Sequence, residues 1–233
     1  MQDFDNFIDT SDYFPSLAET KEAVASSQTR FLRTISESSL SRDKKEAIFK
    51  NIAFLRREAY KGLQQKEEWR GDPSFEEAYS YRFNTTGIFS QAVADLWCIA
   101  TNTPEDKRSS TREAVTHIGM AIQYVDDFLD IKDDKPSDGN LVHAVLTEHP
   151  DERTRITNEL LNRKEGRLFK IFNRFAPEST RVLMKRLDEE ISPLAEISVR
   201  TERTVRGLIK LMFSKAILTD SNDGSFYKRI KVL

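Results

Sequence analysis

Acidic side chains gather in the stretch IQYVDDFLDIKDD, residues 122–134, which holds five aspartates. On a helix, residues at i, i+4 and i+8 share a face, so Asp126, Asp130 and Asp134 would form a carboxylate stripe with Asp127 beside it. Like charges one turn apart destabilise a helix, and the helix dipole is unfavourable to them at the C-terminal end. The stripe is therefore either a solvated acidic face or a site where divalent cations neutralise the carboxylates. Hard oxygen ligands suit Mg²⁺, which usually takes one or two carboxylates and is completed by water and phosphate.

The opposite face of this helix is predicted to pack against the core. Its apolar residues are Ile118, Ala121, Ile122, Val125 and Leu129.

A second acidic cluster opens the chain. The segment DNFID, residues 5–9, places Asp5 and Asp9 one helical turn apart, and it shares with DDFLD, residues 126–130, the order acid, Asn or Asp, Phe, aliphatic, acid. Two such helices facing each other would make a cup with carboxylates on both walls. The alternative is an acidic N-terminal tail without a fixed structure.

The bulk composition indicates one all-α domain over residues 1–233. Charged residues make up 32% of the chain and hydrophobic residues 38%, while 8 Gly and 7 Pro are too few for a sandwich or barrel with many turns. The net charge of -2 gives no basic field for nucleic acid. No apolar run approaches about 18 residues, so we expect no transmembrane segment. Cys98 is the single cysteine, which together with the acidic N-terminus favours a reducing, cytoplasmic location.

Apolar residues recur at helical spacing along most of the chain. The aspartate-bearing helix is expected over 111–132, between a loop at 102–110 and a break at 133–140 that contains Pro136 and Gly139. Pro193 is expected to kink the last long helix. The other predicted helices are one opening at Ser16, then 42–69, 74–101, 141–147, 151–175 and 177–218.

The stretch GMAIQYVDDFLDIKDD, residues 119–134, resembles the second aspartate-rich motif of class I isoprenoid synthases. The pattern G-x-x-F-Q-x-x-D-D-x-x-D of chain-elongating prenyl diphosphate synthases is matched in register by Gly119, Gln123, Asp126, Asp127, Asp130 and Asp134. In the frame of the squalene/phytoene synthase branch the matching residues are Gln123, Asp130, Asp133 and Asp134. The segment DNFID resembles the first motif of the same superfamily, about 120 residues earlier.

This resemblance implies a helical bundle that ionises an allylic prenyl diphosphate, as a transferase or a lyase, before condensation or cyclisation. By family analogy the carboxylates on the two walls would hold about three Mg²⁺ ions, which neutralise the leaving group. The implied catalytic residues are Asp5, Asp9, Asp126 and Asp130. The implied metal ligands are these four with Asp127 and Asp134.

Contacts to the substrate are expected from basic, polar and aromatic residues. The candidates are Gln123, Arg82, Phe83, Gly87, Tyr227, Lys228 and Arg229. The segment around Phe83 and Gly87 has two interpretations, because Asn, Thr and Gly conflict with helix propensity in an otherwise apolar helix. It is either a wall of the prenyl pocket or a place where small residues let two helices pack closely.

Several alternatives follow from what the sequence lacks. In the family, helices precede the first motif, whereas here the motif begins at residue 5. Either the chain is a fragment that lacks these helices, or a partner chain supplies them; a homodimer is the other expected assembly. The serious rival is a non-catalytic helical subunit or an inactive relative. A ferritin-like di-iron bundle needs paired E-x-x-H motifs, and Glu113 and His117 are spaced i, i+4 instead. A His-Asp phosphohydrolase is disfavoured because the sequence contains no His-Asp dipeptide.

Overall fold

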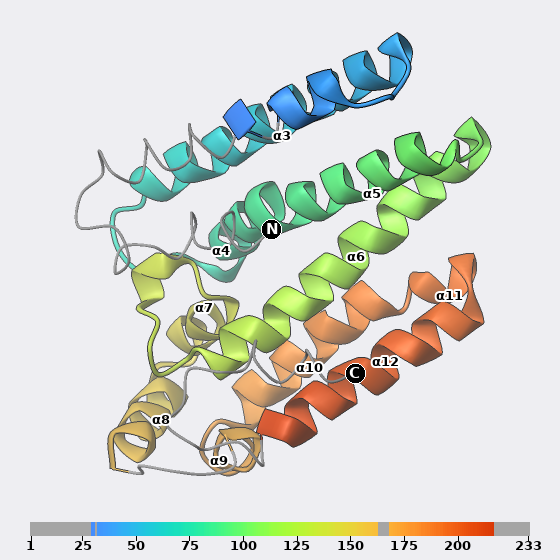
Figure 1. Ribbon diagram of the computed structural model, residues 1–233. Helices are drawn as coiled ribbons and strands as arrows, with labels where there is room; N and C mark the ends of the chain where they lie inside the picture. Colours follow the sequence, from blue (N-terminus) through green and yellow to red (C-terminus); the bar gives the residue numbers. More distant parts are fainter. Residues whose placement is uncertain (1–28, 31, 163–167, 217–233) are drawn as a thin grey trace.

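The described part of the computed structural model, residues 29–30, 32–162 and 168–216, is helical and contains no β-strand (Figure 1). The sequence-based prediction of an all-α fold is therefore confirmed at the level of class. The first motif with Asp5 and Asp9, the helix start at Ser16 and the tail with Tyr227, Lys228 and Arg229 all lie outside the described residues.

Long helices lie side by side in the order α3, α5, α6 and then α10 with α12, and the short helices α7 to α9 gather at one end (Figure 1). Helix α6 is central, since it packs against α5 on one side and against α10 and α12 on the other. The elements are α3 (Arg42–Glu67), α4 (Phe75–Arg82), the π-helix η1 (Phe83–Gly87), α5 (Ile88–Thr101), α6 (Glu105–Leu129), the 3₁₀-helix η2 (Pro136–Asp138), α7 (Leu141–Glu148), α8 (Pro150–Asn162), α9 (Leu168–Phe175), α10 (Pro177–Ile191), α11 (Leu194–Ile197) and α12 (Val199–Ala216).

The core lies between α6 and the C-terminal helices. Phe128 of α6 meets Phe172 of α9 with ring centroids 4.8 Å apart, and α7 contributes Leu141 and Val145, which are fully buried. Fully burying an aliphatic or aromatic side chain of this size stabilises the fold by about 1.5–3 kcal/mol. The end of α6 that carries the aspartates therefore packs into the hydrophobic core.

Two predicted helical ranges, 42–69 and 74–101, are confirmed to within two residues at their ends. Helix α3 begins at the predicted residue 42 and ends at Glu67, two residues before the predicted end. Its start is fixed by Ser41, whose side chain accepts a hydrogen bond from the Lys44 backbone. The range 74–101 runs through α4, η1 and α5 without interruption, from a capping box in which Ser74 and Glu77 satisfy each other's backbone N–H groups.

The boundaries of α6 differ from the prediction at both ends. The expected loop at 102–110 is only three residues long, because Asn102 ends α5 in the left-handed conformation with a φ of 55° and the acidic first turn of α6 starts at Glu105. At the other end α6 stops at Leu129, and Asp130 is already its C-cap. Asp134 therefore lies beyond the helix, not on its surface.

The C-terminal half contains more turns than its periodicity suggested. The predicted helix 151–175 consists of two helices, α8 and α9, which pack against each other. The predicted kink at Pro193 is a full break, where α10 ends at Ile191 and α12 runs back along α6 (Figure 1). Proline lacks the N–H that would continue the helix, and the packing of α12 against α6 stabilises the reversed direction of the chain. Within the described ranges, no helix is both long enough and apolar enough to cross a bilayer.

Candidate functional site

Adjacent aspartates of α6 have different surroundings. Asp127 is 1% exposed, whereas Asp126 is exposed and Asp130 is half-buried. The predicted packed face is correct for Ala121 and Val125, both fully buried, but wrong for Ile122, which is 39% exposed. The buried side of α6 is rotated toward Asp127, so Ile122 and Asp126 share the exposed side, one turn apart.

Asp127 is the centre of a buried polar network. One carboxylate oxygen accepts hydrogen bonds from Arg82 Nη2 at 2.8 Å and from Gln123 Nε2 at 2.6 Å. The other oxygen accepts the backbone N–H of Leu141 at 2.7 Å, at the start of α7. Burial raises the pKa of the Asp127 carboxyl, and the facing guanidinium, the Leu141 N–H and the Gln123 amide all act against burial. The four groups form a closed set, because both carboxylate oxygens already have donors.

Arg82 also joins separate segments of the chain. Its Nε donates to the Gly139 carbonyl at 3.1 Å, and its side chain is 9% exposed. Burial is the largest single influence and lowers the pKa of the Arg82 guanidinium, but Asp127 together with Tyr81, Asp134 and Asp126 raises this pKa overall. The structure thus gives Asp127 and Arg82 a role that differs from the predicted ones. They form an internal ion pair that holds α6 against α4 and the loop before α7.

The other predicted substrate contacts among the described residues are Gln123, Phe83 and Gly87. Gln123 is buried, and its Oε1 accepts from the Thr86 hydroxyl at 2.6 Å, so its amide orients Asp127. Phe83 stacks on Tyr79 with centroids 6.4 Å apart. A Cβ on Gly87 would lie 3.0 Å from the Phe83 ring of the same π-helix and 3.4 Å from Met120 Sδ of α6, so Gly87 lies against α6.

The segment 83–87, whose Asn, Thr and Gly residues are poor helix formers, is not a regular α-helix. These residues form the π-helix η1, a wider turn that often occurs at functional sites. The Thr85 hydroxyl donates a hydrogen bond to the Tyr81 carbonyl at 2.9 Å, and the Thr86 hydroxyl donates to Gln123 Oε1. Arg82 and Thr86, four residues apart, both reach α6, where Arg82 bonds to Asp127 and Thr86 to Gln123.

Asn140 is a site residue that the motif comparison did not include. It is fully buried, and its Nδ2 donates both to the Asp127 carbonyl at 2.7 Å and to Asp134 Oδ2 at 2.8 Å. Its Oδ1 accepts the backbone N–H groups of Val142 and His143 and so caps α7. An Asn directly before a predicted helix start is a recognised N-cap signal, which could have identified it.

The outer carboxylates remain as the candidate metal ligands. Asp126 and Asp130 follow each other by one turn at the end of α6, and the Asp130 N–H bonds to the Asp126 carbonyl at 2.9 Å. Asp134 is half-buried and directs one oxygen to Asn140. Among the described residues no group of three or more His, Cys, Asp or Glu side chains is arranged to hold a metal. Two carboxylates fit Mg²⁺ that is completed by water and by substrate phosphates.

Comparisons with known proteins add no relative. No protein-family model, no curated protein and no solved structure matches this chain.

Proposed function

We propose that this chain acts on an allylic prenyl diphosphate, as a Mg²⁺-dependent protein of the class I isoprenoid synthase type. The observation that carries the proposal is the difference in environment among the aspartates of α6. Asp127 is buried in an ion pair with Arg82, whereas the exposed Asp126 and the half-buried Asp130 lie at the end of the same helix. An ion pair that fixes the end of α6 holds these two carboxylates in a defined position, as a metal site requires.

In this proposal Asp126 and Asp130 hold Mg²⁺, which would neutralise the negative charge that builds up on the diphosphate. The allylic C–O bond breaks, its electron pair leaves with the diphosphate, and an allylic cation remains. Exposed Ile122, one turn before Asp126, offers an apolar surface beside the carboxylates for the prenyl chain. Asp5, Asp9, Lys228 and Arg229 lie outside the described residues, and their part in the site stays a prediction from the sequence.

The experiment is incubation with geranyl, farnesyl or geranylgeranyl diphosphate and Mg²⁺, with and without isopentenyl diphosphate as the second substrate, with the products read by gas chromatography–mass spectrometry. The proposal predicts a hydrocarbon, an alcohol or a longer diphosphate, and Mg²⁺-dependent release of pyrophosphate. Intact substrate with all three diphosphates would contradict it.

A non-catalytic helical subunit is the second candidate, favoured by two exposed aromatic side chains. Trp97 of α5 is 65% exposed and Tyr60 of α3 is 62% exposed. Large aromatic residues are common at protein–protein interfaces. This candidate predicts no product and no thermal stabilisation by prenyl diphosphate with Mg²⁺, whereas an enzyme is stabilised by a ligand that binds only its folded state.

A further inference from the structure

Helix α3 carries an excess of positive charge at the edge of the described bundle (Figure 1). It holds eight Lys or Arg residues and four Asp or Glu residues, so its net charge is +4, whereas the net charge of the whole chain is -2. Positive charge is therefore concentrated on one outer helix of an otherwise acidic protein, as expected of a surface that meets an anionic partner.

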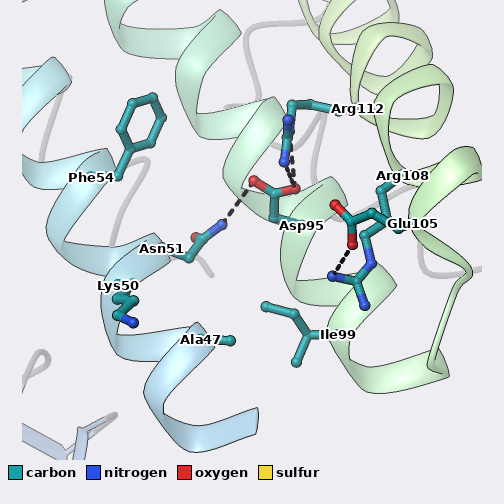
Figure 2. A pocket seen from close by; sticks show the side chains of 9 residues that line it. All are labelled: Ala47, Lys50, Asn51, Phe54, Asp95, Ile99, Glu105, Arg108 and Arg112. Atoms are coloured by element: carbon teal, nitrogen blue, oxygen red, sulfur yellow. Dashed lines mark hydrogen bonds and ion pairs between the residues drawn. The ribbon is translucent and has the colours of Figure 1, made fainter. Parts of the chain in front are cut away.

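The inner side of α3 is fixed by its contact with α5, where Asn51 Nδ2 donates to Asp95 Oδ2 at 3.2 Å (Figure 2). Tyr60 follows Asn51 by nine residues, about two and a half helical turns, and so points to the opposite side. The exposed residues at helical spacing on this outer side are Ala53, Arg56, Tyr60 and Gln64. The exposed acids Glu67 and Glu68 follow only at the end of the helix.

Three exposed cations surround Tyr60, namely Arg56, Arg57 and Lys61. A single carboxylate, that of Glu58, is shared by Arg57 Nε and Lys61 Nζ, each at 2.8 Å, and Arg56 makes no ion pair within the described part of the chain. These four charged residues leave two uncompensated positive charges within two turns of helix. Exposed ion pairs contribute little in water, so both paired cations are able to exchange Glu58 for another anion.

Apolar groups accompany these cations. Tyr60 is 62% exposed, and Leu63, one turn later, is 37% exposed. Tyrosine favours the headgroup region of a bilayer, where its ring and its hydroxyl both find suitable surroundings, and Lys and Arg place their apolar stems there with their charges at the lipid phosphates. The apolar inner side of α3 is already used by the bundle, since Ile48 is 5% exposed, so α3 is able to lie on a bilayer but not to insert deeply.

We propose that the outer side of α3, from Ala53 to Gln64, docks on an anionic phospholipid surface. The three cations contact lipid phosphates, and Tyr60 with Leu63 reaches the headgroup region. An acidic protein segment is the competing partner. It fits less well, because two exposed apolar side chains fall short of the apolar core of a stable protein–protein interface. The inference does not rest on the proposed function, and its test needs neither Mg²⁺ nor a prenyl diphosphate.

The test is co-sedimentation of the full chain with phosphatidylcholine vesicles and with vesicles in which about one-third of the lipid is phosphatidylserine. We expect binding to the anionic vesicles alone, and binding that weakens as salt is raised, because exposed charges are screened. Soluble inorganic phosphate at equal ionic strength should not compete, since a single anion does not replace a charged surface. Equal binding to both kinds of vesicle, or no binding to the anionic ones, overturns the proposal.

Variants locate the contact. Each basic residue near an anionic bilayer contributes about fivefold to partitioning, so Arg56→Gln/Lys61→Gln should weaken binding about 25-fold while the Arg57–Glu58 pair stays intact. Arg181→Gln/Lys185→Gln removes the same charge from two exposed cations of α10, beyond α6 from α3, and should change binding less than about twofold. An equal loss in both double variants would mean that net charge, not the outer side of α3, controls binding.

Tyr60→Ser tests the apolar part of the contact. It should weaken binding by a similar factor at every salt concentration, because burial of apolar surface is not screened. Unchanged binding in Tyr60→Ser would contradict the assignment of Tyr60 to the headgroup region. Binding of the unaltered chain to immobilised polyglutamate but not to anionic vesicles would identify an acidic protein segment as the partner and overturn the lipid proposal.

Discussion

Asp126 and Asp127 are neighbours in sequence, but Asp126 is exposed and Asp127 is buried. Asp127 is enclosed by Arg82, Gln123 and the Leu141 N–H, so its charge is neutralised within the protein. Removing one partner of a buried ion pair leaves the other charged and desolvated, which destabilises far more than the net contribution of the pair. Breaking the internal pair should therefore destabilise the fold, whereas the proposed chemistry depends on Asp126 and the half-buried Asp130.

Arg82→Met tests the internal pair. We expect the free energy of unfolding to fall by about 3–5 kcal/mol, because Asp127 is then buried without its counter-ion. The double variant Arg82→Met/Asp127→Leu should recover much of this loss, since both charges are removed together. Urea denaturation measures both, with Arg33→Met at an exposed pair as the control, where a change of less than about 1 kcal/mol is expected. A double variant as unstable as Arg82→Met would show that the pair is not the cause.

His117 gives a second prediction, for pH dependence. Its Nδ1 lies 2.9 Å from Glu190 Oε2, and the Tyr79 hydroxyl donates to the other Glu190 oxygen at 2.6 Å, so α4, α6 and α10 meet here. The hydrogen bond to Glu190 raises the pKa of His117 above its ordinary value of 6.5, while burial acts in the opposite direction. A raised folded-state pKa stabilises the protein fully below the unfolded value, and this stabilisation is lost as the pH rises through the folded value.

The free energy of unfolding should therefore decline as the pH is raised from about 6 through the titration of His117. In His117→Gln this part of the decline should disappear, as measured by chemical denaturation across the same pH range. An unchanged slope in the variant would show that another group controls the pH dependence.

At the scale of elements, the close contact between α5 and α6 accounts for the glycine at position 119, which lies in the stretch that resembles the isoprenoid synthase motif. No ligand is needed for this explanation. A Cβ on Gly119 would lie 1.9 Å from Ser90 Oγ and 2.7 Å from Ser90 Cβ. Glycine at this position lets the two helices approach closely. The match of Gly119 to the motif is thus consistent with helix packing alone.

Gly119→Ala should lower the free energy of unfolding by about 1–3 kcal/mol, because the helices must separate or Ser90 must move. Gly207→Ala is a matched control, since Gly207 is also helical and a Cβ there meets nothing within 4 Å. That control should be stabilised by about 0.5–1 kcal/mol. Thermal denaturation of the two variants separates a steric effect from helix propensity, and stabilisation of Gly119→Ala would refute the close contact.

Local patterns predicted the elements better than the arrangement of their side chains. The spacing of apolar residues was sufficient to place α3 and the α4–α5 segment. The reversal after Pro193 and the division into α8 and α9 depend on packing between distant segments, which periodicity does not encode. The burial of Asp127 was missed for the same reason, because its counter-ion Arg82 lies 45 residues earlier in the chain.

At the scale of the whole molecule, α6 is the central helix of the described fold, because it packs against α5 on one side and against α10 and α12 on the other. Its C-terminal end carries Asp126 and Asp130.

Without ligand, removing charge at the end of α6 should slightly stabilise the protein. Asp126→Asn relieves repulsion from Asp130 and an unfavourable interaction with the helix dipole, so we expect a gain of about 0.2–0.5 kcal/mol at low salt. The gain should shrink in 1 M salt, where charges are screened over about 3 Å. Denaturation at the two salt concentrations measures it, and a loss of stability would mean that Asp126 makes a contact on which the fold depends.

The most direct test of the central claim is calorimetric titration of farnesyl diphosphate into the chain, with Mg²⁺ and then with EDTA. We predict saturable binding that requires Mg²⁺, that is lost in Asp126→Asn/Asp130→Asn, and that persists in Asp106→Asn at the exposed start of the same helix. Binding of equal strength in EDTA, or in the doubly substituted protein, would contradict a metal-bridged diphosphate site at the end of α6.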